Sequence, residues 1–257
     1  MRVIKNIFLA IVGLIVILIA LVITSFRPNF PSNTVELIPT TSAEGMNVLV
    51  FGGTRNTGLE LTKLLTARGD RVTAFVRPTS DRSQLQKLDV KFAVGDAMKL
   101  DTIVDAFSEN NFDAVVSTIG NIRGNPPPDF QGNANIFDAA VKSGVKRVVM
   151  ISTIGAGNSS ASWLSKIILS DVLPLKTQAE EYLRETGLDF TIIRPGGLPP
   201  DEGTGGGVLT EDPETFGFIA RADLARLIVG VLDDNKTIGK TYSAIDLARS
   251  SPWDRDN

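Results

Sequence analysis

The sequence predicts an α/β protein with a doubly wound parallel sheet, preceded by a single N-terminal transmembrane helix. Three observations lead to this prediction. Short apolar runs alternate with segments of helical spacing from Met46 onward, a glycine-rich turn follows the first run, and residues 7–26 form an unbroken apolar stretch. Buried strands that alternate with helices are typical of a parallel sheet covered on both faces.

The N-terminal stretch is long enough to cross a membrane. Residues 7–26 carry no charged side chain, and twenty residues of helix span about 30 Å, the thickness of the hydrocarbon core. A buried core helix or a cleaved signal peptide are the alternatives. A core helix rarely lacks a polar face over this length, and the run exceeds the usual signal-peptide core with no small-residue cleavage site behind it. We therefore expect residues 1–26 to be a retained membrane anchor.

Residues 27–45 are expected to form an extended linker, because they combine Ser, Thr and Asn with the prolines Pro28, Pro31 and Pro39 and show no apolar periodicity. One domain then occupies residues 46–257, a length that can bury a full core.

Six apolar runs in this domain are expected as strands, at residues 46–51, 71–76, 90–94, 112–118, 145–151 and 190–193. The segments between and after them have apolar residues at helical spacing and are expected as helices, at residues 58–67, 100–107, 130–143, 161–185 and 222–232. The fourth of these helices should be broken near Pro174, since proline removes a helical hydrogen bond.

The composition excludes several kinds of chemistry. The chain has 257 residues, a formal net charge of −3, and neither cysteine nor histidine. Disulfides, thiolate metal sites, cysteine nucleophiles and Ser-His-Asp triads are therefore excluded. Basic residues are scattered rather than clustered, so we expect no nucleic-acid partner, and we expect no metal. Any reaction must use hydroxyl groups, lysine, carboxylates or a bound cofactor.

The turn after the first strand predicts a Rossmann-type dinucleotide site. It opens the first helix of the domain and consists of Gly52, Gly53, Thr54, Arg55, Asn56, Thr57 and Gly58. Glycines permit the tight turn and let the backbone approach a pyrophosphate, whose charge is stabilised by the N–H groups of the helix N-terminus. The alternative is a flexible turn without a ligand.

The end of the second strand favours NADP(H) over NAD(H). Proteins that bind NAD place Asp or Glu there for the ribose 2′-hydroxyl, whereas this chain has Arg77. A guanidinium suits a 2′-phosphate, and Arg55 could supply a second positive group. The alternative is that both are ordinary surface arginines.

Several segments together resemble the atypical short-chain dehydrogenase/reductase family, in its NAD(P)-binding, NmrA-like branch that includes flavin/biliverdin-reductase-like proteins. They occur in family order and are VFGGTRNTG (50–58), AFVRP (74–78), VGD (94–96), VVSTIG (115–120), RVVMISTIGAG (147–157), KTQAEEYLRETGLDFTIIRPGGL (176–198) and IARADLARLIVGVL (219–232). The resemblance covers nearly all of the chain after Met46.

The resemblance implies roles for further residues. Asp96 would lie near the adenine, and Thr118, Ile119 and Gly120 beside the cofactor ribose. At the other end of the cofactor, the resemblance implies that Ser152 and Thr153 lie near the nicotinamide, that Lys176 contacts its ribose, and that the backbone of Pro195 and Gly196 lines the pocket. Of these, Ser152, Thr153 and Lys176 are the candidate catalytic residues.

Two positions depart from the family pattern. Arg55 replaces the central glycine of the usual loop. More importantly, the tyrosine of the catalytic Tyr-x-x-x-Lys is Val172 if Lys176 is the lysine, and neither Tyr182 nor Tyr242 has the spacing to replace it. The usual proton relay is therefore absent.

Two functions remain open at this point. A reductase would transfer hydride to a small electron-poor acceptor such as a flavin or quinone, with a proton from solvent, Ser152 or Thr153. Alternatively, the chain is a non-catalytic NADP(H)-binding redox sensor or an assembly factor for a membrane complex, with a membrane protein as partner. An empty Rossmann scaffold is a third possibility, which the intact glycine loop and the two arginines argue against.

The orientation of the anchor depends on two arguments that conflict. Arg2 and Lys5 precede the helix and only Arg27 follows it closely, so the positive-inside rule places the domain outside the cytoplasm. NADP(H) is supplied on the cytoplasmic side. We expect a single-pass membrane protein with its domain on the cytoplasmic face.

Two segments have no single interpretation. Residues 198–216 are rich in glycine and could form a mobile lid or a plain flexible connection. The apolar residues 163–175 could cover the pocket, form an interface or rest on a membrane surface.

Overall fold

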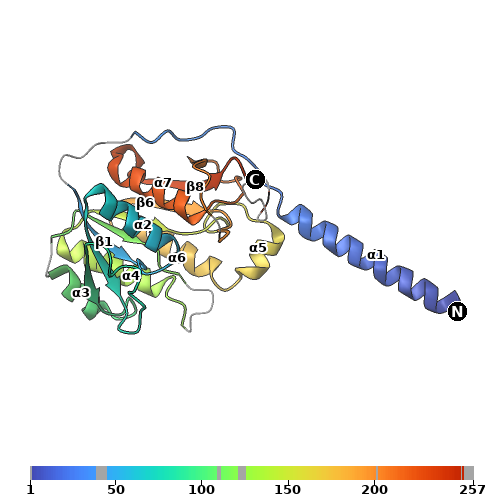
Figure 1. The fold of residues 1–257 in the computed structure, drawn as a ribbon, viewed down its shortest axis with the longest axis horizontal. Coiled ribbons are helices and arrows are strands. Elements are labelled where there is room, and N and C mark those ends of the chain that lie inside the picture. The colour runs from blue at the N-terminus through green and yellow to red at the C-terminus, as the bar shows by residue number, and fades with distance from the viewer. Residues whose placement is uncertain are drawn as a thin grey trace.

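An eight-stranded sheet forms the centre of the domain (Figure 1). The computed structural model describes residues 2–38, 45–108, 111–120, 126–200, 202–249 and 251, with side chains from Asn6 onward. The strands are β1 (Asn47–Phe51), β2 (Arg71–Val76), β3 (Val90–Val94), β4 (Ala114–Ser117), β5 (Arg147–Ile151), β6 (Asp189–Pro195), β7 (Gly207–Thr210) and β8 (Lys240–Asp246). Their order is β3-β2-β1-β4-β5-β6-β8-β7. All neighbours are parallel except β7, which is antiparallel to β8.

Helices cover both faces of the sheet, because alternate residues of each strand point to opposite cores. The helices of the domain are α2 (Asn56–Arg68), α3 (Leu100–Ser108), α4 (Gln131–Ser143), α5 (Trp163–Ile168), α6 (Leu173–Glu185) and α7 (Arg221–Asp233), followed by the short η1 (Asn235–Thr237). In β1, Val48 and Val50 belong to the core beneath α2 and α7, whereas Leu49 and Phe51 belong to the core beneath α3, α4 and α6. The predicted α/β architecture with a mostly parallel sheet is confirmed.

Two strands were missing from the sequence prediction, which gave a sheet of six. β8 reads KTYSAID, with polar residues at several positions, so it lacks the continuous apolar run by which the other strands were recognised. β7 has only four residues and lies in the segment interpreted as a mobile lid or flexible connection. Pairing with β8 satisfies its backbone groups, which residue type alone does not reveal.

The glycine-rich segment before β7 is tied to α7 as well. The Asp223 carboxylate accepts hydrogen bonds from the backbone N–H groups of Thr204 (2.8 Å) and Gly205 (3.1 Å). Asp223 is itself buried. Within residues 198–216, the lid interpretation is therefore wrong for residues 204–210. The buried Asp223 carboxylate holds Thr204 and Gly205, and β8 pairs with β7.

The predicted helix over residues 161–185 is two helices, and the break lies before Pro174 rather than at it. α5 ends at Ile168, and α6 begins at Leu173, so Pro174 occupies the first turn of α6. The first N–H groups of a helix have no partner within the helix, so proline costs nothing at that position.

The N-terminal helix α1 (Arg2–Ser25) projects away from the domain (Figure 1). Its residues Asn6–Ser25 are long and apolar enough to cross a membrane, and none of the most apolar part is buried against the rest of the described chain. A core helix of a soluble protein would be mostly buried. The exposed surface of α1 is therefore unlike that of a core helix.

The segment after α1, expected as a linker, lies against the domain as far as the structure describes it. Asn29 pairs with Phe216 and Val35 with Leu209 in isolated antiparallel bridges. Leu37 packs so closely on α7 that a Cβ at Gly230 would lie 2.8 Å from its side chain. Residues 39–44 of the expected linker, and residues 252–257 at the end of the expected domain, lie outside the described residues.

A buried guanidinium ties α7 and η1 to the amino-terminal edge of the sheet, opposite the ends at which ligands bind such sheets. Arg147, at the start of β5, donates to the Asp189 carbonyl (3.0 Å), the Val231 carbonyl (2.7 Å) and the hydroxyls of Thr191 (2.9 Å) and Thr237 (3.0 Å). Burial lowers the pKa of Arg147 to about 10, which leaves it charged at neutral pH.

We predict that Arg147→Met lowers the free energy of unfolding by about 3 kcal/mol, because the acceptors around a buried charged donor lose their partner. Lys146→Met, a change at the exposed neighbouring residue, is the matched control and should shift it by less than about 0.5 kcal/mol. Denaturant unfolding of the detergent-solubilised chain, followed by circular dichroism, measures both. Equal small shifts in the two variants would contradict the assignment.

Candidate functional site

A cavity of about 940 Å³ opens at the carboxyl-terminal edge of the parallel strands. Its walls include the turns that follow β1, β2, β3, β4, β5 and β6. β1 and β4 are neighbours at the centre of the sheet, where the strand order reverses. Ligands of open α/β sheets bind at this kind of switch point.

Nearly all of the predicted site residues line this one cavity. They are Gly52, Thr54, Arg55, Asn56, Thr57, Gly58, Arg77, Asp96, Thr118, Ile119, Gly120, Ser152, Thr153, Lys176 and Pro195. Two do not line it. A Cβ at Gly53 would meet the Thr62 side chain of α2 at 2.9 Å, and one at Gly196 would meet the Gly217 carbonyl at 2.2 Å, so both glycines serve close packing behind the wall.

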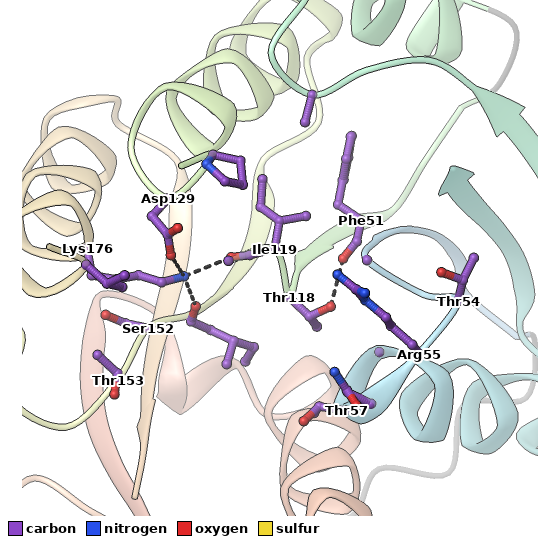
Figure 2. Close-up of a pocket in the computed structure, with 18 of the residues that line it drawn as sticks. Phe51, Thr54, Arg55, Thr57, Thr118, Ile119, Asp129, Ser152, Thr153 and Lys176 are labelled. Atoms are coloured by element: carbon purple, nitrogen blue, oxygen red, sulfur yellow. Dashed lines mark hydrogen bonds and ion pairs between the residues drawn. The ribbon is translucent and has the colours of Figure 1, made fainter. Parts of the chain in front are cut away.

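Figure 2 shows how the labelled residues divide between the two ends of the cavity. Thr54, Arg55 and Thr57 of the glycine-rich turn lie at one end. Lys176, Ser152 and Thr153 lie at the other. Phe51, Thr118 and Ile119 lie between them, so the cavity is long and has chemically different ends.

Close backbone approach explains the glycines of the turn. A Cβ at Gly58 would lie 2.2 Å from the Gly52 carbonyl oxygen and 2.7 Å from the Thr118 hydroxyl. Gly52 has a φ of +86°, a conformation that side chains disfavour. The turn therefore packs directly on the segment after β4, and no larger residue fits at Gly58.

The same turn leaves the N-terminus of α2 open toward the cavity. Arg55, at the N-cap, has an extended backbone, and its side chain makes no capping hydrogen bond in the described structure. Asn56, Thr57 and Gly58 in the first turn of α2 line the cavity. Helix N-termini carry partial positive charge and N–H groups without helical acceptors, so this end suits an anion.

Two exposed arginines stand beside this end. Arg55 and Arg77 both line the cavity, and neither is buried. Arg77 follows directly on β2, as predicted. Their guanidinium groups can therefore reach a bound anion without a prior desolvation cost.

At the opposite end, Lys176 is buried and held by three acceptors (Figure 2). Its ammonium donates to the carbonyls of Ile119 (2.8 Å) and Ile151 (3.0 Å) and forms an ion pair with the Asp129 carboxylate at 3.4 Å. Burial lowers the pKa of the Lys176 ammonium, and the Asp129 carboxylate opposes this shift. Lys176 thus joins α6 to the segment after β4 and to the end of β5.

Ser152 is connected to a second buried charge on α6. Its hydroxyl donates to Glu180 at 2.6 Å, and Glu180 receives two hydrogen bonds from the Arg194 guanidinium, at 2.9 and 2.5 Å. Arg194 also donates to Asn158 at 2.8 Å. The Ser152 proton is therefore directed into the protein, whereas Thr153 is only half-buried and donates at 3.2 Å to the neighbouring Ile154 carbonyl.

Sequence reasoning missed Asp129 and Glu180, the two carboxylates that organise this end. Glu180 could have been found, since it follows Lys176 by four residues and so lies on the same face of a helix. Asp129 carries no comparable signal, because it lies in a proline-rich turn that reaches Lys176 only through the fold.

Val172 stands where the family tyrosine is expected. It lies one helical turn before Lys176, whose backbone N–H donates to its carbonyl at 2.9 Å, and its side chain is buried in the cavity wall. Leu169, whose carbonyl accepts a hydrogen bond from the Val172 N–H at 2.9 Å, and Leu198 also line the cavity. Apolar side chains therefore stand at the position of the family tyrosine, beside the polar groups of Lys176, Ser152 and Thr153, and no tyrosine lines the cavity in the described part of the chain.

Comparison with known proteins identifies the family. Residues 52–235 match the NAD(P)H-binding family, and the chain belongs to it. The uncharacterized sugar epimerase YhfK of Bacillus subtilis is 28% identical over 203 residues, which cover 77% of this chain and 92% of that protein.

Two reductases are also similar. Sanguinarine reductase of Eschscholzia californica is 36% identical over 121 residues, covering 44% of this chain and 43% of that protein. The solved structure of ChuY, an anaerobillin reductase from Escherichia coli O157:H7, superposes with a TM-score of 0.72 at 28% identity and covers 78% of this chain and 97% of ChuY. This supports the predicted branch of atypical reductases and epimerases.

We predict that Glu180→Gln lowers the free energy of unfolding by about 3 kcal/mol, since it leaves the buried Arg194 without its opposite charge. Glu181→Gln, at the exposed neighbouring residue, is the control and should leave stability within about 0.5 kcal/mol. Thermal unfolding of both variants in detergent tests this. A Glu180→Gln variant as stable as the control would show that the pair contributes nothing.

Proposed function

We propose that this member of the NAD(P)H-binding family is an NADP(H)-dependent reductase of the atypical short-chain type, which reduces a small electron-poor acceptor such as a flavin or quinone. The observation that carries the proposal is the single cavity that joins the open N-terminus of α2 to an apolar wall at Val172. One end suits the phosphates of a dinucleotide, and the other suits a flat apolar acceptor.

The glycine turn fits a dinucleotide. The Gly58 position, where a Cβ would strike the Gly52 carbonyl, brings the backbone close enough for the first-turn N–H groups of α2 to bind the pyrophosphate. Arg77 and Arg55 would hold the 2′-phosphate, and this favours NADP(H) over NAD(H). Asp96 would lie near the adenine.

The residues at the other end would orient the reacting ring. When bound, the nicotinamide supplies the hydride. Lys176 and the carbonyl groups that it holds fix the floor beneath the ring, and Thr153 and Pro195 line the same end. The ammonium already has three protein acceptors, so its contact with the nicotinamide ribose would replace the longest of them, the contact with Asp129.

The absence of tyrosine limits the choice of acceptor. Oxidation of a sugar hydroxyl needs a base to take its proton, and Val172 cannot do so. A flavin or quinone accepts hydride into a conjugated system that stabilises the negative charge, so the proton can follow from solvent or from Thr153. Leu169, Val172 and Leu198 would contact the apolar face of such an acceptor.

The reductase activities named for the two similar proteins support this proposal. We also propose that α1 is a membrane anchor and that the domain lies on the cytoplasmic face, where NADP(H) is available. The exposed apolar surface of α1 supports the anchor.

A non-catalytic role as a redox sensor or membrane-complex assembly factor is the second candidate. It is favoured by the protein partners that occupy both the Lys176 ammonium and the Ser152 hydroxyl, together with Val172. In that case a bound dinucleotide would stabilise the domain without turnover.

One prediction of the proposed function concerns cofactor choice and turnover. The full chain in detergent should bind NADPH more tightly than NADH and oxidise it only when a flavin or quinone is present. Arg77→Glu should weaken NADPH binding about tenfold or more, because it replaces a charge-assisted bond by repulsion. Arg71→Glu, at the opposite end of β2, is the matched control and should leave the NADPH affinity unchanged.

Fluorescence titration and NADPH absorbance measure these outcomes. Binding without turnover on any acceptor would favour the sensor or assembly role. Equal NADPH affinity in the Arg77→Glu and control variants would remove the argument for NADP(H).

Another prediction of the proposed function concerns the glycine-rich turn after β1. Gly58→Ala should abolish NADPH binding, since the added Cβ would lie 2.2 Å from the Gly52 carbonyl and push α2 away from its phosphate-binding position. Gly69→Ala, at the other end of α2, is the control: its Cβ would meet nothing within 4 Å, and the positive φ costs only about 1 kcal/mol of stability. Unchanged NADPH affinity in a folded Gly58→Ala variant would show that the turn does not bind the phosphates.

A further inference from the structure

α5 (Trp163–Ile168) presents an apolar surface that the domain does not use. None of its six residues is buried. Trp163, Ile167 and Ile168 are 48%, 62% and 56% exposed. Three large apolar side chains on one exposed turn and a half of helix are unusual for a surface in contact with water.

α5 lies beside the point where α1 leaves the domain (Figure 1). The two helices are in contact. Residues next to each helix also bind the same residue, Glu214. Asn29, just after α1, donates from its side chain to the Glu214 carbonyl at 2.7 Å. Ser160, just before α5, donates to the Glu214 carboxylate at 2.6 Å.

Further contacts hold the base of α1 in place. The backbones of Asn29 and Phe216 exchange hydrogen bonds of 2.7 and 3.0 Å, and the rings of Phe26 and Phe218 lie 6.2 Å apart. If α1 crosses a membrane, these contacts determine which surface of the domain faces that membrane. It is the surface that carries α5.

The residues of this surface are those that favour the membrane interface. Trp163 is of the type enriched at the level of the lipid headgroups, and the exposed Lys166 can direct its ammonium toward them. The base of α1 carries a similar pair of side chains, one apolar and one basic. These are Phe30, which is 44% exposed, and the exposed Arg27.

The apolar wall of the cavity continues from this surface. Leu169 follows α5 directly, and both it and Val172 line the cavity. Leu198 also lines the cavity and is joined to the base of α1, because the neighbouring Gly197 pairs with Phe218, whose ring contacts that of Phe26. The end of the cavity proposed for the acceptor is therefore the end next to α5.

We infer that α5 lies in the interfacial layer of the membrane that α1 crosses, and that the acceptor enters the cavity from the lipid phase. The acceptor is thus a bilayer-soluble molecule such as a long-chain quinone. The position of α5 rests on α1 as an anchor, and the acceptor class rests on the proposed reductase function.

The position of α5 can be tested without any activity. The chain has two tryptophans, so Trp253→Phe leaves Trp163 as the only one. In vesicles of brominated phosphatidylcholine, the Trp163 fluorescence of the reconstituted full chain should fall strongly relative to unbrominated vesicles. The control moves the reporter to α4, by Val141→Trp in the background of Trp163→Phe and Trp253→Phe, since Val141 is equally exposed at 50% and α4 lies far from α1 (Figure 1). That reporter should not be quenched.

Quenching of Trp163 no greater than that of the Val141→Trp reporter would overturn the membrane position. A cross-link between the Trp163 side chains of two copies of the chain in the same vesicles would show that the α5 surface is a dimer interface. The inferred membrane position would then be wrong.

The route of the acceptor is tested separately by comparing a long-chain and a short-chain quinone in reconstituted vesicles. Ile167→Asp with Ile168→Asp should raise KM for the long-chain quinone about tenfold, because charges oppose interfacial insertion, and should leave kcat/KM for the soluble short-chain quinone unchanged. Val141→Asp should change neither. Equal effects on both quinones would overturn entry from the lipid phase. Failure of the unaltered chain to reduce either quinone would overturn the acceptor class through the proposed function, while the quenching result would still decide the position of α5.

Discussion

The site depends on two buried charges that lie one turn apart on α6. Lys176 binds a carbonyl just after β4 and the last carbonyl of β5, and Glu180 binds Ser152 and the Arg194 guanidinium of β6. Charges removed from water are tolerated only when they are paired and fully hydrogen-bonded, so each one demands its partners in place. α6 therefore ties together the carboxyl ends of three neighbouring strands, and it is these ends that form the floor of the cavity.

This arrangement explains how the cavity keeps its shape without the family tyrosine. The lysine does not need a tyrosine neighbour to be held, because backbone carbonyls and Asp129 fix its ammonium. Val172 is then free to contribute an apolar surface where a proton donor is expected. An enzyme built in this way would depend on its acceptor to stabilise the transferred charge, and this restricts it to conjugated acceptors rather than simple alcohols.

The opposite end of the cavity depends on backbone geometry instead of buried charge. Gly58 and Gly52 allow the turn after β1 to pack against Thr118, and the first N–H groups of α2 face the cavity as a result. The base of α1 is fastened, beside α5, to the segment that contains Phe216 and Phe218. α1, α5 and the Leu169 and Val172 side chains that line the cavity thus lie on one side of the domain, an arrangement that connects the proposed membrane location with the proposed chemistry.

Local sequence patterns were sufficient for strands β1 to β6, the helices between them, the glycine turn and the position of Arg77, because each of these depends on apolar periodicity or on a turn that only certain residues can form. They were not sufficient for β7 and β8, since a short or partly polar strand is stabilised mainly by the neighbour it pairs with. Nor could they show that Asp129 reaches Lys176, that Glu180 accepts a hydrogen bond from the Ser152 hydroxyl, or that the segment after α1 lies against the domain. Those contacts join residues far apart in the chain, and only the folded structure brings them within hydrogen-bonding distance.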